Sequence, residues 1–244
     1  MSSASFKPRI LCVSIYDEMA QLVRQSAGQF GVEVDIFNGG IYSCGHIHAL
    51  KMEDRYDVII SQAGTAIAIQ QMVKIPVVPI QITASDIISP LREAAEHHKK
   101  LLCITYDSNL SEDIEELAAF AKLKNFQQVI YRNAQDFSNI IDRLPSLKGA
   151  AVIGFGGCVM DKAAQHGLPY YLIRSSKNSV RQAVLSARNI VEQHIKERTR
   201  SRRLNNIINY SLSGIISVNS DKTVAICNRP AKQILDLHGK KLVG

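Results

Sequence analysis

The chain has 244 residues, of which 46% are hydrophobic and 21% charged, and it carries a formal net charge of +7. This composition excludes a fibrous or mostly disordered protein, and the length suits one large domain or two modest ones. No apolar run approaches the ~18 residues of a membrane span and no signal peptide opens the chain, so we expect a cytoplasmic protein with no membrane partner.

The beginning of the chain alternates apolar strands with helical patterns. Strands are expected at residues 9–17 (RILCVSIYD), in VEVDIF, in YDVIISQ and at residues 75–82 (IPVVPIQI), and EMAQLVRQSAGQFG between the first two is expected to be a helix. Continuous apolar strands that alternate with helices are typical of a parallel sheet covered on both faces. An α/β fold is therefore predicted.

The same pattern then begins again. Strands are expected at residues 100–108 (KLLCITYDS) and in QQVIYR, AAVIG and YYLIRS, and SEDIEELAAFAKLK is expected to be a helix with Ser111 as its N-cap. Cys12 and Cys103 lie 91 residues apart within LCVS and LCIT, and Gly64 and Gly157 lie 93 residues apart. This repeat predicts two similar Rossmann-like lobes of about 85 residues, with parallel sheets around a cleft.

A long helical pattern without internal Gly or Pro begins after the second lobe, and it suits a connector between modules or a dimerising helix. Its apolar stripe would either pair two chains or pack on the first lobe, and it consists of Val180, Val184, Ala187, Val191 and Ile195. We expect a homo-oligomer.

These patterns predict the domain boundaries. Residues 1–200 are expected to form the two-lobed domain, with lobe one at about 6–92 plus the helix from about 179, and lobe two at about 98–176. The connector helix is placed at 179–205. Residues 206–244 read strand, turn, strand, helix and stop in mid-pattern, and about 35 residues are too few for an independent domain.

The excess positive charge is concentrated in residues 196–203 (KERTRSRR). Such a run is more often the solvated face of a helix than a nucleic-acid contact, and the remaining charge is too diffuse for a nucleic-acid footprint. Direct DNA contact by this segment is the weaker alternative.

Two turns that follow apolar strands are the candidate ligand site, at residues 62–65 (QAGT) and 155–158 (FGGC). At the carboxyl ends of parallel strands, small residues let a ligand approach the backbone, and the next helix presents N–H groups with a partial positive charge. Facing turns on two lobes would hold a small anion, a carboxylate or a phosphate, from both sides. Alternatively, the glycines serve only tight turning and close packing.

No cofactor and no metal is expected. The spacing from Gly157 to Lys162 is wrong for a P-loop, and Val159 stands at the third glycine position of a dinucleotide fingerprint that would begin at Gly154. Residues 44–48 (CGHIH) match no strong zinc spacing and are interpreted as a loop.

An enzyme is the main alternative to a binding domain. The five cysteines form no C-x-x-C pair, which indicates reduced thiols. Cys12 and Cys103 occupy equivalent strands, so paired thiols could run a racemase or isomerase reaction, and Cys158 begins a predicted helix. A catalytic thiol needs an exposed environment that lowers its pKa, whereas ILCVS and LLCIT indicate buried strands, so no catalytic residue is assigned.

Two long segments carry a family resemblance: DVIISQAGTAIAIQQMVKIPVVPIQITASDI followed by LREA, and AAVIGFGGCVMDKAAQHGLPYYLIRSSKNSVRQAV. Through them, residues of about 6–200 resemble the N-terminal sensor domain of the propionate-catabolism activator family, called PrpR. The resemblance implies a two-lobed, periplasmic-binding-protein-like sensor in front of a bacterial sigma-54-dependent transcriptional activator. The tail from about Leu204 resembles the first part of a PAS domain, truncated here.

The resemblance also implies a mechanism and partners. A small anionic metabolite would close the lobes, and the movement would pass through the connector helix to PAS and ATPase modules that the free sensor restrains. DNA, ATP and sigma-54 RNA polymerase would be bound only by modules absent from this chain. The founding ligand of the family is a tricarboxylate, 2-methylcitrate.

By position, the resemblance implies a set of ligand-binding residues: Ser14, Ser61, Gln62, Ala63, Gly64, Thr65, Ser85, Asp86, Gly156, Gly157 and Cys158. Of these, Ser85 and Asp86 are expected on the loop after the fourth strand. The sequence departs from the family pattern at Gln62-Ala63, where members often carry basic and glycine residues, and at Lys177-Asn178, where acidic residues are common.

Overall fold

The structure is a computed structural model that describes residues 8–146 and 149–236. The chain divides into two compact units, Met1–Val191 and Glu192–Gly244. The larger unit contains two four-stranded sheets in which all paired strands are parallel, and the smaller unit contains a two-stranded antiparallel sheet. The predicted α/β fold with two parallel lobes is confirmed.

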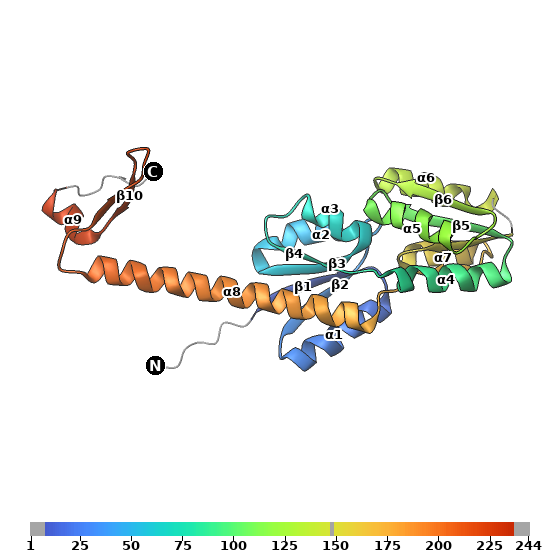
Figure 1. The fold of residues 1–244 in the computed structure, drawn as a ribbon, viewed down its shortest axis with the longest axis horizontal. Helices are drawn as coiled ribbons and strands as arrows, with labels where there is room; N and C mark the ends of the chain where they lie inside the picture. Colours follow the sequence, from blue (N-terminus) through green and yellow to red (C-terminus); the bar gives the residue numbers. More distant parts are fainter. Residues whose placement is uncertain (1–7, 147–148, 237–244) are drawn as a thin grey trace. The chain divides into compact units, whose positions relative to one another are not determined.

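Lobe one has its sheet between two layers of helices (Figure 1). Its elements are β1 (Arg9–Ser14), α1 (Asp17–Phe30), β2 (Glu33–Asn38), α2 (Gly45–Met52), η1 (Glu53–Arg55), β3 (Val58–Gln62), α3 (Ala63–Gln70) and β4 (Val77–Ile80). The strand order is β2-β1-β3-β4. On one face, Leu11 of β1 shares a core cluster with Ala49 of α2 and Ile69 of α3.

Lobe two repeats this arrangement. Its elements are α4 (Ala84–His97), β5 (Lys100–Tyr106), α5 (Asn109–Phe120), β6 (Phe126–Tyr131), α6 (Ala134–Arg143), η2 (Leu144–Ser146), β7 (Ala150–Gly154), α7 (Gly157–Gln165) and β8 (Tyr170–Leu172). The strand order is β6-β5-β7-β8, which repeats the order of lobe one with each strand number raised by four. On one face, Leu102 of β5 packs with Phe137 of α6 and Val159 of α7.

Two helices are exchanged between the lobes. Helix α4 follows the last strand of lobe one, but its Ile87 and Leu91 lie in the core of lobe two with Cys103. Helix α8 (Lys177–Tyr210) follows lobe two, yet its Arg181 guanidinium lies 5.4 Å from the centroid of the Phe30 ring in lobe one. The end of lobe one that was predicted at about residue 92 therefore falls inside a helix of lobe two.

Four of the five residues of the apolar stripe of α8 are buried within the larger unit, whereas Ile195 is half-buried and belongs to the smaller unit. Val180, Val184 and Ala187 are 0% exposed, and Val191 is 1% exposed. Of the two alternatives that the sequence left open, the structure therefore shows these four residues packed inside their own unit. The homo-oligomer stays a prediction.

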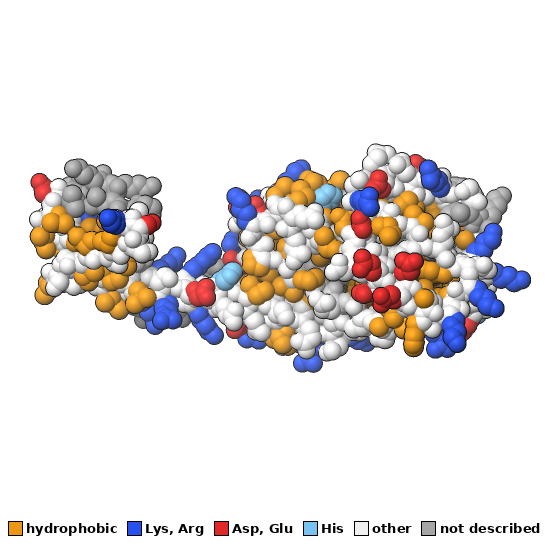
Figure 2. Space-filling model, turned by 45° about the horizontal axis from the view of Figure 1, so that its top comes forward, with side chains coloured by type: hydrophobic (Ala, Val, Ile, Leu, Met, Phe, Trp, Pro, Cys, Tyr) orange, Lys and Arg blue, Asp and Glu red, His pale blue; other side chains and the backbone are white. Residues whose placement is uncertain are grey.

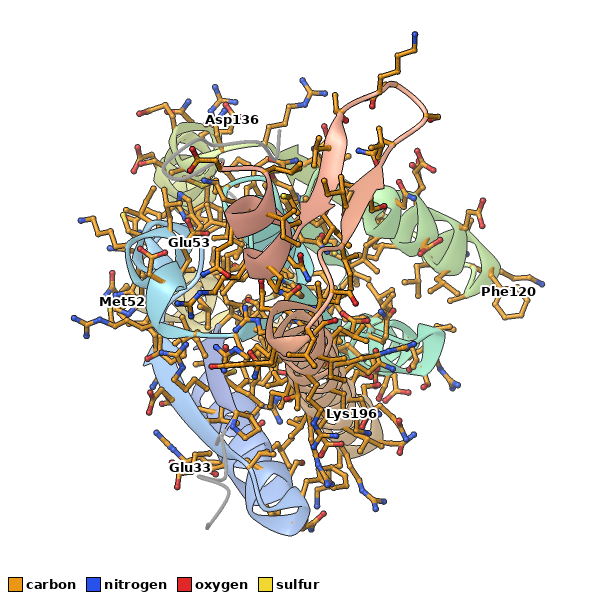
Figure 3. All side chains as sticks on the ribbon, turned by 90° about the vertical axis from the view of Figure 1, so that its left-hand side faces the viewer. Glu33, Met52, Glu53, Phe120, Asp136 and Lys196 are labelled. Carbon is orange, nitrogen blue, oxygen red and sulfur yellow. The ribbon has the colours of Figure 1, made fainter. Side chains whose placement is uncertain are left out.

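The smaller unit begins with the rest of α8 and continues with β9 (Ile216–Val218), β10 (Val224–Cys227) and α9 (Arg229–Ile234). This is the expected order of strand, turn, strand and helix. Apolar side chains spread over the surface of this unit (Figure 2), and the large exposed ones include Leu212, Ile216, Val218 and Ile234. Residues 196–203 are exposed on α8, where Lys196 is labelled in Figure 3, which agrees with a solvated helix face.

Two local predictions were wrong. Helix α5 begins before Ser111, and the Ser111 hydroxyl donates to the Ser108 carbonyl at 2.6 Å, so Ser111 lies in the first turn and is not the N-cap. Residues 45–48 open helix α2 instead of a loop, because the Gly45 N–H donates to the Gly40 carbonyl at 2.8 Å and the His48 ring stacks on Phe37.

No helix within residues 8–146 and 149–236 combines the length and the hydropathy of a membrane span.

Candidate functional site

A cleft of about 500 Å³ lies between the lobes, where the strands of both sheets end. Lobe one contributes residues at or just after the ends of β1, β2 and β3, and lobe two contributes the corresponding residues of β5, β6 and β7. In open parallel sheets, ligands bind beyond the carboxyl ends of the strands. The volume is also within the range of small-molecule sites, about 300–1,000 Å³.

The cleft brings together most of the residues predicted for the ligand site. Its lining includes Ser14, Ala63, Gly64, Thr65, Gly156, Gly157 and Cys158. Ser61 and Gln62 are fully buried outside this lining, and the Ser61 hydroxyl donates to the Val13 carbonyl at 2.9 Å.

Ser85 and Asp86 are placed differently from the prediction. They lie in the first turn of α4 and not on a loop, and neither lines the cleft. The Asp86 carboxylate accepts the Thr83 N–H at 2.9 Å, and the Thr83 side chain accepts the Asp86 N–H. This capping box explains the acidic residue at that position by helix stability.

Gly64 lies where the two lobes touch. A Cβ atom on Gly64 would overlap the side chain of Tyr106, which belongs to lobe two. Its equivalent in the repeat, Gly157, has room for a Cβ atom, because the nearest neighbour would be the Ile15 carbonyl oxygen at 3.8 Å. The Gly157 N–H donates to that same oxygen at 2.9 Å. The two repeated turns therefore hold direct contacts between the lobes.

Both turns require a left-handed backbone just before the body of the helix. Ala63 has a φ of 47° and Gly156, its equivalent, a φ of 91°. Glycine adopts such a φ without steric cost, whereas an L-residue such as alanine loses roughly 1–2 kcal/mol. Helices α3 and α7 start at these turns, so the partial positive charge of each N-terminus lies at the cleft.

An aromatic wall, formed by Tyr42, Tyr106, Tyr131 and Phe137, lines one side of the cleft. The ring centroids of Tyr131 and Phe137 are 4.9 Å apart, and those of Tyr106 and Tyr131 are 5.5 Å apart. Tyr42 comes from lobe one and meets Phe137 of lobe two at 5.4 Å. Burial raises the pKa of Tyr131, so its phenol is neutral.

The charged groups of the cleft are mostly acidic. Three carboxylates, from Asp17, Glu18 and Asp161, stand against one guanidinium, from Arg174. Glu18 pairs with Arg174 at 3.2 Å. The Asp17 carboxylate accepts a hydrogen bond from the Asn38 amide at 3.3 Å, and within the described residues neither Asp17 nor Asp161 has a cationic partner.

The segments that cross between the lobes meet at Ser175. Its N–H donates to the Tyr16 hydroxyl at 3.1 Å, and its own hydroxyl donates to the Gln81 carbonyl at 3.2 Å. The fully buried Gln62 amide lies close enough to lower the pKa of Tyr16, but neither of its polar atoms makes a hydrogen bond within the described residues. Burial outweighs this effect and raises the pKa of Tyr16 overall.

The cysteines do not form a catalytic pair. Cys12 and Cys103 are 0% exposed, and burial raises the pKa of each thiol to about 12. Cys158 lines the cleft, but burial and then the Asp161 carboxylate raise the pKa of its thiol as well. Protonated thiols are poor nucleophiles and poor bases, which argues against the racemase alternative.

The described part of the chain contains no group of three or more His, Cys, Asp or Glu side chains arranged to hold a metal ion. His46 and His48 lie on α2, and burial lowers the pKa of His46.

Sequence reasoning missed the aromatic and acidic lining. Tyr106 and Tyr131 are the last residues of β5 and β6, and Asp17 is the first residue of α1. Their positions where a strand ends or a helix begins could therefore have indicated that they line the cleft. Tyr42 and Phe137 lie in a loop and within a helix, away from strand ends, and only the folded chain brings them to the cleft.

A family model described as propionate catabolism activator matches residues 29–197 of this chain. Among curated proteins, no significant match is found.

Two solved structures are similar to this chain, and the first of them shows the same fold. An NtrC family transcriptional regulator from Clostridium acetobutylicum is 22% identical with a TM-score of 0.65, and the match covers 78% of this chain and 100% of that chain. A conserved domain protein from Vibrio cholerae O1 biovar eltor is 12% identical with a TM-score of 0.48, covering 78% and 85% of the two chains. The two-lobed unit thus has the periplasmic-binding-protein-like fold that was predicted.

Proposed function

This chain belongs to the propionate catabolism activator family, and we propose that its two lobes sense a small-molecule effector on behalf of a transcriptional regulator. The effector binds in the cleft between the lobes, which is lined from both sheets.

The contact between the lobes carries this proposal. Gly64 packs against Tyr106, and the Gly157 N–H donates to the Ile15 carbonyl, so the two lobes are in direct contact beside the cleft, and we take this arrangement as the closed form. A ligand in the cleft contacts both walls only in this closed form. It shifts the population toward closure by its difference in affinity for the closed and open forms.

The effector is proposed to carry an anionic group, a carboxylate or a phosphate. Helices α3 and α7 both begin at the cleft, and the N–H groups of a first helical turn lack intrahelical acceptors. Such N-termini favour negative charge.

Closure is proposed to reach the rest of the regulator through α8. Ser175 lies two residues before this helix and is bonded to Tyr16 and Gln81, so movement between the lobes displaces the place where α8 begins. Helix α8 then continues into the smaller unit, which we propose to be the start of a PAS domain. ATPase and DNA-binding modules of the longer regulator, acting on sigma-54 RNA polymerase as a homo-oligomer, would receive the signal.

Thermal unfolding of the full chain tests the proposal. The chain is melted with a panel of organic acids, amino acids and phosphate esters, because a ligand at 100 times its Kd adds about 2.7 kcal/mol to the free energy of unfolding. We expect at least one compound to raise the Tm of the wild type and of Gly28→Ala but not of Gly64→Ala, because only the methyl group at position 64 meets Tyr106.

Gly28→Ala is the control, since it makes the same change within helix α1 of lobe one, away from the cleft lining, where an added Cβ atom has open space. The proposal fails if no compound in the panel raises the Tm of the wild type. It also fails if the compounds raise the Tm of Gly64→Ala as much as that of Gly28→Ala.

A further inference from the structure

We infer that the effector is an aminocarboxylate, with one carboxylate, one cationic nitrogen and an apolar or aromatic body, and that it is not a di- or tricarboxylate. This inference rests on the proposed function, because it takes the cleft as the effector site. The argument comes from the charges and rings that line this cleft.

The charges of the cleft favour a cation. Asp17 on α1 and Asp161 on α7 come from opposite lobes, and neither has a cationic partner within the described residues. The single guanidinium, from Arg174, is already paired with Glu18 at 3.2 Å. A polycarboxylate would therefore place its charges beside unpaired carboxylates, whereas an ammonium group would compensate them.

The aromatic wall also favours a ligand with a cationic group and an apolar body. Tyr42, Tyr106, Tyr131 and Phe137 form a chain of ring contacts whose centroids are 4.9 to 5.5 Å apart. The face of an aromatic ring carries negative charge, so it attracts cations and packs against apolar groups.

The remaining polar features suit a single carboxylate. The two helix N-termini at Gly64 and Gly157 offer backbone N–H groups, but the Gly157 N–H is already bonded to Ile15 across the cleft.

Calorimetric titration of the full chain with four matched probes tests the inference. The probes are phenylalanine, 3-phenylpropionate (which lacks the ammonium group), phenethylamine (which lacks the carboxylate) and citrate (a tricarboxylate). We expect phenylalanine to bind about tenfold or more tightly than 3-phenylpropionate and phenethylamine, and we expect citrate to bind most weakly.

Charge-neutral variants identify the groups responsible. Asp17→Asn and Asp161→Asn should each weaken phenylalanine binding by about tenfold and leave 3-phenylpropionate binding unchanged or tighter, because only the ammonium group loses its partner. Asp113→Asn is the control, since Asp113 is an exposed carboxylate on α5 that does not line the cleft.

The outcomes separate this inference from the proposed function. If citrate or 3-phenylpropionate binds at least as tightly as phenylalanine, and Gly64→Ala abolishes that binding, the aminocarboxylate inference is wrong and the sensor remains. If all four probes fail to bind and the only compounds of the wider panel that stabilise the chain lack an ammonium group, the inference is also wrong. If no compound binds at all, both fail.

Discussion

Ala63 illustrates how a repeated fold constrains a single residue. It has a φ of 47° at the turn after β3, and Gly156, its equivalent at the turn after β7, also has a positive φ, of 91°. The backbone conformation is imposed by the sharp change from strand to helix, and the side chain at position 63 does not relieve it. The same turn positions Gly64 against Tyr106, so the strained residue supports the contact between the lobes.

Replacing Ala63 by glycine should stabilise the protein. Glycine adopts a positive φ without the clash of a Cβ atom, so we expect Ala63→Gly to raise the free energy of unfolding by about 1 kcal/mol in denaturant titration. Ala66→Gly is the control, because Ala66 lies in the same helix, outside the positive-φ residues, and glycine there should cost about 1 kcal/mol. Equal destabilisation by both changes would contradict a strained turn.

The buried thiols show what burial does to a side chain that sequence alone leaves ambiguous. Cys12 and Cys103 sit at paired positions of the repeat, and that symmetry suggested a catalytic pair. Both are 0% exposed, and burial raises the pKa of each thiol to about 12, so neither is a thiolate near neutral pH. Their apolar neighbours in ILCVS and LLCIT already indicated burial.

At the scale of elements, Asn228 organises the smaller unit. Its side-chain amide donates to the carbonyls of Ile208 and Ser213 at 2.7 and 2.9 Å. Its side-chain oxygen accepts the N–H groups of Ile215 and Ala231 at 2.8 and 2.9 Å. One side chain, 1% exposed, thereby links the end of α8, the loop before β9 and the start of α9.

Asn228→Ala should destabilise this unit selectively. The change removes the hydrogen-bond partner of backbone groups in α8, in the loop before β9 and in α9. We therefore expect the free energy of unfolding of this unit to fall by about 2–4 kcal/mol, measured as faster amide hydrogen exchange at Ile215 and Ala231. Exchange in β1 and β5 should not change. Asn206→Ala serves as the control, because Asn206 is exposed on α8, and unchanged exchange at Ile215 in Asn228→Ala would refute the role given to Asn228.

Helices α4 and α8 show why a boundary in sequence is not a boundary in space. Their first residues, Ala84 and Lys177, are 93 residues apart, the same offset as Gly64 and Gly157. Each helix follows one lobe in sequence and packs with the other, as Ile87 does with Cys103 and Arg181 with Phe30. The lobes are therefore joined by two crossing segments, and these meet at Ser175 and Gln81.

At the scale of the whole two-lobed unit, closure depends on the fit between the turns. Gly64→Ala should hold the lobes apart even without ligand, because the added methyl group overlaps the side chain of Tyr106 near its backbone. We expect small-angle scattering to give a larger radius of gyration for Gly64→Ala than for Gly157→Ala at equal protein concentration. Identical scattering curves for the two variants and the wild type would mean that Tyr106 moves aside and the lobes stay closed.

Much of this architecture was predictable because it depends on local patterns that are repeated. The runs ILCV (residues 10–13) and LLCI (residues 101–104) are apolar at every position, which is typical of a strand buried on both faces, and the offset near 92 residues implies two copies of one unit. The turns with Gly64 and Gly157 were also predicted, because small residues between an apolar run and a helical pattern mark the carboxyl end of a parallel strand.

The sequence by itself thus determined the fold class, the repeat and one edge of the site, since these depend on hydrophobic periodicity and turn chemistry within short segments. The helix from about 179 was assigned to lobe one, but only the tertiary structure decided that α4 packs on lobe two, because this helix directly follows lobe one in the sequence. It also decided the chemistry of the cleft, where Asp17 and Asp161 come from opposite lobes and Tyr42 meets Phe137. Contacts between residues about a hundred positions apart leave no periodic trace in the sequence, so they are set only when the two lobes close on each other.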